Sequence, residues 1–252
     1  MYTIFTTQRS GKTWICSLLK GNGFNQPEEY LNQAFRNVQP YEQKLKNSVV
    51  DFLDYVKTNH GGLVLQRNQI VRLCNKFKLK ENDFCQLLNE RFGDSPNFLL
   101  YRKSLIDHLV SNYIHQKSGY AHSTNPDTTS RESISFTYDE VKDLLDKIVQ
   151  QRHRLIKTAG EIYGTKNIIY YEKVMADPAN FLLKFARTLD MKSTAKKSDF
   201  LLNSPYAKIA DHKDLEIKNA ILESSLGGLI NQYEKSEADK LSSFKDIQQI
   251  KQ

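Results

Sequence analysis

The sequence has no apolar stretch close to the ~20 residues that a helix needs to cross a bilayer. It also lacks the pattern of a secretory signal, in which a basic start is followed by an apolar run. These two absences argue against a membrane-spanning protein and against a secreted one. We therefore expect a cytoplasmic protein whose mature chain starts at Met1.

Cysteine is scarce, with only Cys16, Cys74 and Cys85 in the whole chain. An odd number of cysteines without the spacing of metal ligands argues against a disulfide framework and against a zinc site. The six histidines add no metal-binding pair, since His108 and His115, for example, lie seven residues apart on one expected helix. We expect reduced, packed thiols and no metal.

A clustered basic arm is missing as well. The formal net charge is +7, but the lysines are spread along the chain. This distribution argues against a nucleic-acid-binding groove and favours an anionic ligand. With 39% apolar and 26% charged residues among 252, the chain can bury one sizeable core. We expect one domain over residues 1–226 and a charged, exposed helix or frayed tail over residues 227–252.

Short apolar segments alternate with helical patterns along the chain. The segments rich in β-branched, aromatic and leucine residues predict strands at residues 2–6, 63–65, 98–101 and 168–171. Apolar residues at helical spacing predict helices between them, including residues 13–20, 104–114 and 137–164. This alternation predicts a P-loop-like, three-layer α/β fold with a central, mostly parallel sheet flanked by helices, whose ligands lie beyond the carboxyl ends of the strands.

The first expected strand runs into the segment FTTQRSGKTW. A loop from a strand into a helix aims unpaired N–H groups and the positive end of the helix dipole at one point, which favours an anion. Ser10, Gly11, Lys12 and Thr13 supply the N–H groups, and Arg9 and Lys12 add positive charge. The alternative is a polar turn that only caps the helix.

The ending Gly-Lys-Thr is that of a nucleotide-binding P-loop, yet Thr6 occupies the position of the glycine that should open such a loop. A P-loop nucleotide kinase or NTPase needs the longer cradle and an aspartate at the end of a later strand. Neither is evident, so the loop suits a single phosphate-like group. Two alternatives stay open, a nucleotide kinase or NTPase and a non-catalytic nucleotide-binding module.

Four segments in order, spanning positions 2 to about 191, together resemble the sulfotransferases that use 3′-phosphoadenosine 5′-phosphosulfate (PAPS). They are FTTQRSGKTW, GNGFNQPEEYLNQ, FLLYRKSLIDHLVSNY and IIYYEKVMADPANFLLKFARTLDM. The second is most similar to the bacterial trehalose-type branch. The chain departs from the family loop at Gln8, where a proline is usual, and at Lys12, where a small hydroxyl residue is usual.

This resemblance implies an enzyme that transfers a sulfuryl group in line from PAPS to a hydroxyl, without a metal. Arg9, with Lys12, would neutralise the charge that develops on the 5′-phosphate oxygen, aided by the amides of Ser10 to Thr13. Trp14 would pack the loop or contact the adenine.

The resemblance also implies a site for the 3′-phosphate. Either Arg102 or Lys103 would bind it, together with the hydroxyl of Ser111. The Tyr171–Glu172 pair is expected to be structural.

The acceptor hydroxyl needs a base, and the segment PEEY offers two carboxylates. Pro27 predicts the first turn of a short helix that carries Glu28 and Glu29, of which the resemblance favours Glu29 as the base. The other interpretation is that both acids only stabilise the helix start. The acceptor would be a carbohydrate or another small hydroxylated molecule, and the chain is compatible with a homodimer. The polar loop 117–136, with His122, is expected near the active face.

Overall fold

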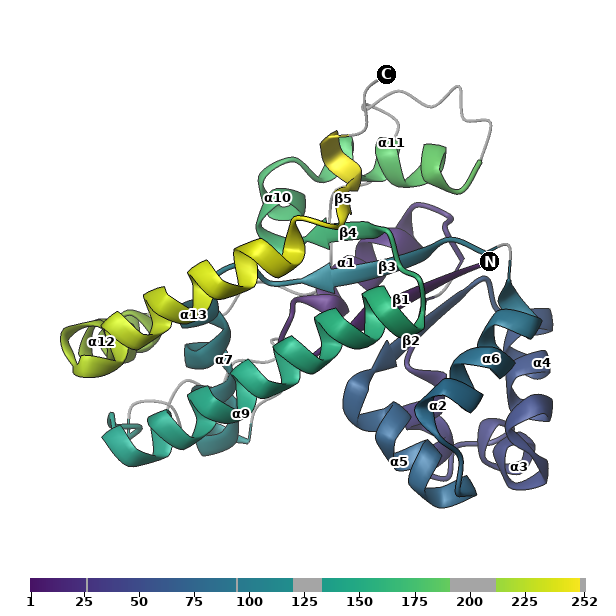
Figure 1. Ribbon diagram of the computed structural model, residues 1–252, viewed down its shortest axis with the longest axis horizontal. Coiled ribbons are helices and arrows are strands. Elements are labelled where there is room, and N and C mark those ends of the chain that lie inside the picture. Colours follow the sequence, from purple (N-terminus) through teal and green to yellow (C-terminus); the bar gives the residue numbers. More distant parts are fainter. Residues whose placement is uncertain (26, 94, 120–132, 191–211, 250–252) are drawn as a thin grey trace.

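The computed structural model describes residues 1–252 except 26, 94, 120–132, 191–211 and 250–252 (Figure 1). Within this part, five strands form one sheet in which every neighbouring pair is parallel, in the order β2-β1-β3-β4-β5. The strands are β1 (Tyr2–Thr6), β2 (Gly62–Gln66), β3 (Asn97–Tyr101), β4 (Asn167–Tyr170) and β5 (Lys245–Asp246). The predicted α/β fold with a central parallel sheet is confirmed.

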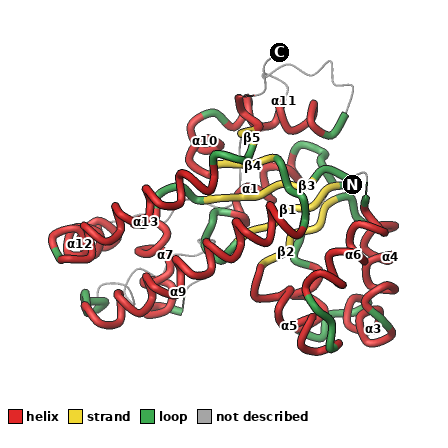
Figure 2. Tube along the Cα trace, in the orientation of Figure 1, coloured by secondary structure: helices red, strands yellow, loops and turns green. Residues whose placement is uncertain are grey.

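The strands alternate with helices on both sides of the sheet (Figure 2). The helices are α1 (Lys12–Gly21), α2 (Tyr30–Phe35), α3 (Tyr41–Asn47), α4 (Val49–Asn59), α5 (Arg67–Phe77), α6 (Glu81–Phe92), α7 (Leu105–Ser118), α9 (Tyr138–Lys157), η1 (Thr158–Ile162), α10 (Tyr171–Ala176), α11 (Pro178–Thr188), α12 (His212–Glu223), α13 (Ser225–Leu241) and η3 (Ile247–Gln249). None of the helices in the described ranges is long and apolar enough to cross a membrane.

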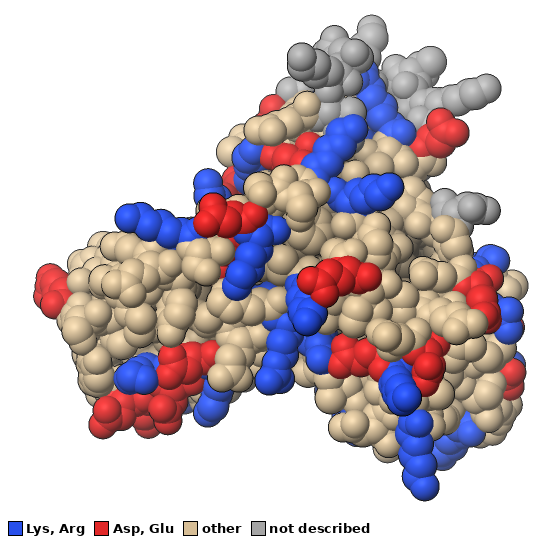
Figure 3. Space-filling model, viewed as in Figure 1, with Lys and Arg blue, Asp and Glu red and all other residues tan. Residues whose placement is uncertain are grey.

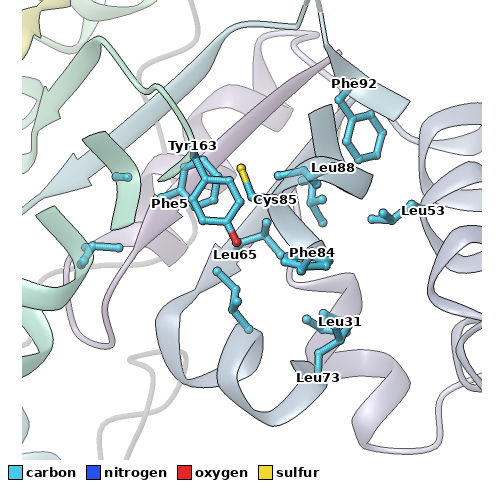
Figure 4. Packing of buried hydrophobic residues seen from close by; sticks show 14 of the residues in the cluster. Phe5, Leu31, Leu53, Leu65, Leu73, Phe84, Cys85, Leu88, Phe92 and Tyr163 are labelled. Carbon is cyan, nitrogen blue, oxygen red and sulfur yellow. The ribbon is translucent and has the colours of Figure 1, made fainter. Parts of the chain in front are cut away.

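Successive strand residues point to opposite faces of the sheet, and each face builds its own core. Phe5 and Leu65 belong to a cluster with α2 to α6, which also contains Tyr163 and Phe84 (Figure 4). Ile4 and its neighbours on the other face pack against α1, α10, α11 and η3. These two clusters are why every residue of β1 and β2 is buried and why the sheet lies between two helical layers.

A third cluster lies away from the sheet, where α7, α9, α12 and α13 pack against one another. These helices project to one side as an arm, opposite the group formed by α3 to α6 (Figure 1). On the face in Figure 3, Lys and Arg side chains are interspersed with Asp and Glu rather than gathered in one patch. This agrees with the scattered charge of the sequence.

The C-terminal segment differs from the exposed helix or tail expected from Gly227. Helix α13 begins at Ser225, so it crosses the expected boundary, and β5 then pairs with β4. Ile247 is fully buried against the sheet. The apolar residues of this segment pack against the helices of the arm and against the edge of the sheet. Their burial keeps the segment folded although its composition is polar.

Of the loop predicted over residues 117–136, the structure describes only residues 117–119 and 133–136. Helix α7 continues to Ser118, four residues beyond the predicted end. His122 and the rest of positions 120–132 lie outside the described residues.

Candidate active site

The order of the strands places the candidate site at the carboxyl ends of the central strands β1 and β3. The chain leaves β1 for β2 on one side and returns to β3 on the other, so the loops that follow β1 and β3 diverge at this point. Ligands of open parallel sheets bind in the crevice that such a reversal leaves beyond the carboxyl ends of the strands. The loop of residues 7–11 and the pair Arg102–Lys103 both lie there.

Hydrogen bonds of two hydroxyl groups stabilise the loop that follows β1. The hydroxyls of Thr6 and Ser10 are 2.5 Å apart, and Ser10 Oγ also donates to the carbonyl of Thr7 at 3.0 Å. Ser10 is fully buried. Thr6 therefore takes a structural role at the position of the missing glycine, and the side chain of Ser10 is committed to bonds within the loop.

The helix start that follows the loop is open for an anion. Helix α1 begins at Lys12, and no side chain caps its first turn. By helix geometry, the N–H groups of Lys12, Thr13 and Trp14 have no partner within the helix and point out of its start. Helix starts of this kind can bind an anion, and anion binding at this one stays a prediction.

Gly11 is required at the start of this helix for two reasons. Its φ of +87° lies in the left-handed region that favours glycine. A Cβ at this position would also lie only 2.1 Å from Cδ2 of Tyr171. The ring of Tyr171 thus packs on the loop, and Trp14 meets its edge with the ring centroids 6.3 Å apart. Both aromatic residues pack beside the loop, and an adenine contact of Trp14 stays a prediction.

Arg9 connects the loop to helix α7. Its Nε donates to Oγ of Ser111 at 3.1 Å, and Nη1 of Arg102 donates to the carbonyl of Arg9 at 3.2 Å. The guanidinium of Arg102 also lies over the ring of Tyr171, 5.4 Å from its centroid. The residues expected at the 5′- and 3′-phosphates are therefore in direct contact.

Lys103 is held by its backbone, and its side chain is exposed. The carboxylate of Glu172 accepts the N–H groups of Lys103 and Ser104, each at 3.0 Å. Glu172 thus fixes the backbone that leads into α7, whose N-cap is Ser104, and this is a structural role. Of the two basic residues proposed for the 3′-phosphate, Arg102 is the one that contacts the loop.

Glu29 lies beside Lys12, the first residue of α1. Its Oε2 forms an ion pair with Nζ of Lys12 at 2.9 Å, with side chains 21% and 17% exposed. The carboxylate of Glu28 turns away and accepts a hydrogen bond from Gln33 at 2.5 Å. The two acids therefore face different surroundings, and Glu29 is the one that contacts Lys12.

The predicted start of a short helix at Pro27 is wrong. Glu28 forms a parallel bridge with Leu63, and its carbonyl accepts the N–H of Val64 at 3.0 Å. This pairing extends the backbone alongside β2, and α2 begins only at Tyr30. Glu29 is placed by an extended segment and not by a helical turn.

A network of buried, hydrogen-bonded side chains contacts the backbone of the loop. Arg152 of α9 is 1% exposed and forms an ion pair with Glu237 of α13 at 2.6 Å. Its Nη1 donates to the carbonyl of Arg102 at 2.9 Å and lies 3.4 Å from Nδ1 of His108. Nε2 of His108 is 2.6 Å from the carbonyl of Gln8. A carbonyl only accepts, so Nε2 carries the proton and donates it, while Nδ1 accepts from Arg152.

This network predicts a loss of stability in acid. Burial, and then the charge of Arg152, lowers the pKa of His108 to about 3. A histidine near 6.5 in the unfolded chain and near 3 in the folded one stabilises the fold at neutral pH, and that contribution is lost as the pH falls below 6.5. We expect His108 to account for a fall of about 2 kcal/mol in the free energy of unfolding between about pH 7 and pH 5.

Urea unfolding of the wild-type chain and of His108→Gln at the two pH values measures this contribution. The pKa values of His60 and His153 are also lowered by burial, but both residues are present in both chains, so their effects cancel in the comparison. Equal acid sensitivity of the two chains would show that His108 is not responsible.

Most of the predicted site residues lie together at the carboxyl end of the sheet. Further residues in contact with them were missed by the sequence analysis. Arg152 could have been found, because it interrupts the apolar face of its helix between Val149 and Leu155. Gln66 ends a buried strand, which is a weaker signal. Glu237 had no signal, since its segment was read as exposed.

No family model matches the chain, and no curated protein matches it. Over the described ranges, no group of three or more His, Cys, Asp or Glu side chains is placed to hold a metal ion.

Proposed function

We propose that the chain is a PAPS-dependent sulfotransferase that acts on the hydroxyl of a carbohydrate or another small acceptor. Support comes from the site geometry taken with the resemblance of the four segments. An open helix start, two arginines and a hydroxyl lie at the carboxyl edge of a parallel sheet, with a carboxylate beside them.

The residues at this edge fit a nucleotide with phosphate groups at two ends. The first turn of α1 offers N–H donors in front of one group, and Lys12 adds a cation there. On the side of α7, Arg102 and Ser111 are available to the second group, and Arg9 contacts both of them, through its carbonyl at 3.2 Å and through its Nε at 3.1 Å. Arginine donors in a planar fork suit a phosphate group.

PAPS, when bound, supplies the sulfuryl group and a leaving phosphate. The chain's own residues then have three tasks. The loop amides and Arg9 stabilise negative charge on the 5′-phosphate oxygen. Arg102, with Ser111, binds the 3′-phosphate. Glu29 takes the proton from the acceptor hydroxyl.

The observation that carries the proposal is the contact between Lys12 and Glu29. A carboxylate 2.9 Å from the lysine weakens the binding of an anion, because the carboxylate and the anion carry like charges and repel each other. A transfer reaction needs both groups side by side, one for the leaving charge and one for the proton.

Two assays test this function on the purified chain. A thermal-shift comparison of adenosine 3′,5′-bisphosphate, ATP and AMP, with and without a chelator, is expected to favour the bisphosphate and to be indifferent to the chelator. Incubation with radiolabelled PAPS and a panel of hydroxyl acceptors is expected to label an acceptor. Magnesium-dependent stabilisation by ATP would instead support a kinase or NTPase. Binding of PAPS without transfer to any acceptor would support a binding module.

Replacing both Arg102 and Lys103 by alanine is expected to weaken adenosine 3′,5′-bisphosphate far more than AMP, since only the former carries the 3′-phosphate. Isothermal titration with both nucleotides measures the ratio. The single variants separate the two side chains, and we expect Arg102→Ala to account for most of the loss, because Arg102 contacts Arg9 while Lys103 is exposed. An equal loss for both nucleotides would contradict the assignment of this pair to the 3′-phosphate.

A further inference from the structure

Two glutamine side chains converge on the carboxylate of Glu29. Nε2 of Gln69 lies 2.5 Å from its Oε1, and Nε2 of Gln66 contacts the same oxygen. The other oxygen, Oε2, is the one paired with Lys12. Each oxygen of Glu29 thus has a separate set of partners.

The chain builds this arrangement from three elements. Gln66 is the last residue of β2 and pairs in register with Thr6, directly beside the start of the anion-binding loop. Gln69 lies in the first turn of α5, which follows at once. The bridge between Glu28 and Leu63 lays the segment before α2 along the same strand. The three side chains meet because the segment before α2 lies along β2, from which α5 follows directly.

The orientation of the Gln69 amide is determined by its other contact. Its Oε1 accepts the backbone N–H of Gln66 at 3.3 Å, so its NH₂ group must face Glu29. Gln66 and Gln69 are 4% and 6% exposed. Buried side chains have few alternative rotamers and little water to replace a lost partner, so these donors have a fixed direction.

We infer that Gln66 and Gln69 are positioning residues for Glu29, which hold its Oε1 and leave Oε2, the oxygen next to Lys12, to take the proton of the acceptor. The catalytic part of this inference rests on the proposed function. In this step the acceptor O–H bond breaks as its oxygen bonds to sulfur, and the proton ends on Oε2. The bond between sulfur and the 5′-phosphate oxygen breaks at the same time, and adenosine 3′,5′-bisphosphate leaves. Lys12 must leave Oε2 for the bound phosphate before that oxygen is accessible.

Hydrogen bonds donated to a carboxylate stabilise its ionised form, so removing them makes ionisation harder. The other titratable groups near Glu29 are Lys12 and Cys16 on α1 and the adjacent Glu28. Burial raises the pKa of Cys16 to about 12, so this thiol stays protonated over the pH range of the test. The strand β2 and helix α5 contribute the two uncharged amides.

The test is a ¹³C-NMR titration of the Glu29 side-chain carboxyl in the ligand-free chain. Gln66→Met/Gln69→Met keeps unbranched side chains of similar length but removes both donors, and we expect the titration midpoint to rise relative to that of the wild-type chain. Gln69→Met alone, which alters only the first turn of α5, is expected to give a smaller rise and serves if the double variant does not fold.

Gln33→Met is the matched control, because Gln33 donates the equivalent amide bond to Glu28. It is expected to leave the Glu29 midpoint unchanged. A midpoint that does not move in the folded double or single variant overturns the inference. So does an equal rise in the Gln33→Met control.

Kinetics separate this inference from the proposed function. If the wild-type chain transfers sulfuryl groups, the acidic limb of the kcat–pH profile is expected to move upward in parallel with the midpoint in Gln69→Met. If the wild-type chain transfers sulfuryl groups but the acidic limb of the kcat–pH profile does not move in Gln69→Met, the positioning role is overturned. A wild-type chain that does not transfer at all overturns the proposed function, and the NMR midpoint then decides the amide contacts alone.

Discussion

We expect Arg9→Ala to abolish measurable sulfuryl transfer, a loss on the order of 10³-fold or more, because Arg9 supplies a fixed cation where charge develops in the transition state. The side chain is directed at α7 and the loop edge, not into either core cluster. The fold should therefore persist, and circular dichroism with thermal melting checks this. Steady-state kinetics with PAPS and the best acceptor measures the loss.

Two further variants separate the side chain from the backbone at this position. Arg9 has a φ of +57°, a conformation that is strained for any residue except glycine. Arg9→Gly removes the side chain and relieves the strain, so a loss equal to that of Arg9→Ala shows that the guanidinium is what matters. Ser111→Ala keeps Arg9 but removes its hydroxyl partner, and a smaller loss is expected.

The contact with Ser111 also defines the result that would contradict this role. If Arg9→Ala leaves turnover within a few fold but weakens adenosine 3′,5′-bisphosphate relative to AMP, Arg9 belongs to the 3′-phosphate and not to the reacting centre.

Local patterns predicted the sheet well because its strands are short and buried on both faces. The segments around Ile4, Val64, Phe98 and Ile168 are apolar runs bounded by turns, which is how central parallel strands read in sequence. The fifth strand could not be predicted in this way. Residues 245–246 are Lys and Asp, and they join the sheet only because α13 returns the chain to its edge.

Long-range pairing is also what the sequence could not reveal about the site. The pattern PEEY predicted a helix start from Pro27, but the bridge of Glu28 to β2 competes successfully for that backbone. The same pairing brings Gln66 and Gln69 to Glu29, although they are 37 and 40 positions away in sequence. The position of residues 9–13 at the junction of β1 and α1 was predictable because a turn from strand to helix is local.

The second large effect is expected at Glu29. An acceptor hydroxyl is a poor nucleophile until a base takes its proton, and a positioned carboxylate contributes on the order of 10²–10⁴-fold. Glu29→Gln keeps the size of the side chain and an oxygen that can accept from Gln66, Gln69 or Lys12, but it cannot take the proton. We expect kcat to fall at least about a hundredfold, with the affinity for adenosine 3′,5′-bisphosphate nearly unchanged.

Glu28→Gln provides the matched control for this prediction. Glu28 is the adjacent acid and also accepts a glutamine amide, but its carboxylate faces Gln33 of α2 and not the loop. The same substitution there should lower kcat much less, since it removes a charge without removing the group beside Lys12. A larger fall in Glu28→Gln than in Glu29→Gln would make Glu28 the base. If neither variant slows turnover, the proton goes to another group, and the ion pair between Lys12 and Glu29 then serves only to hold the empty loop in place.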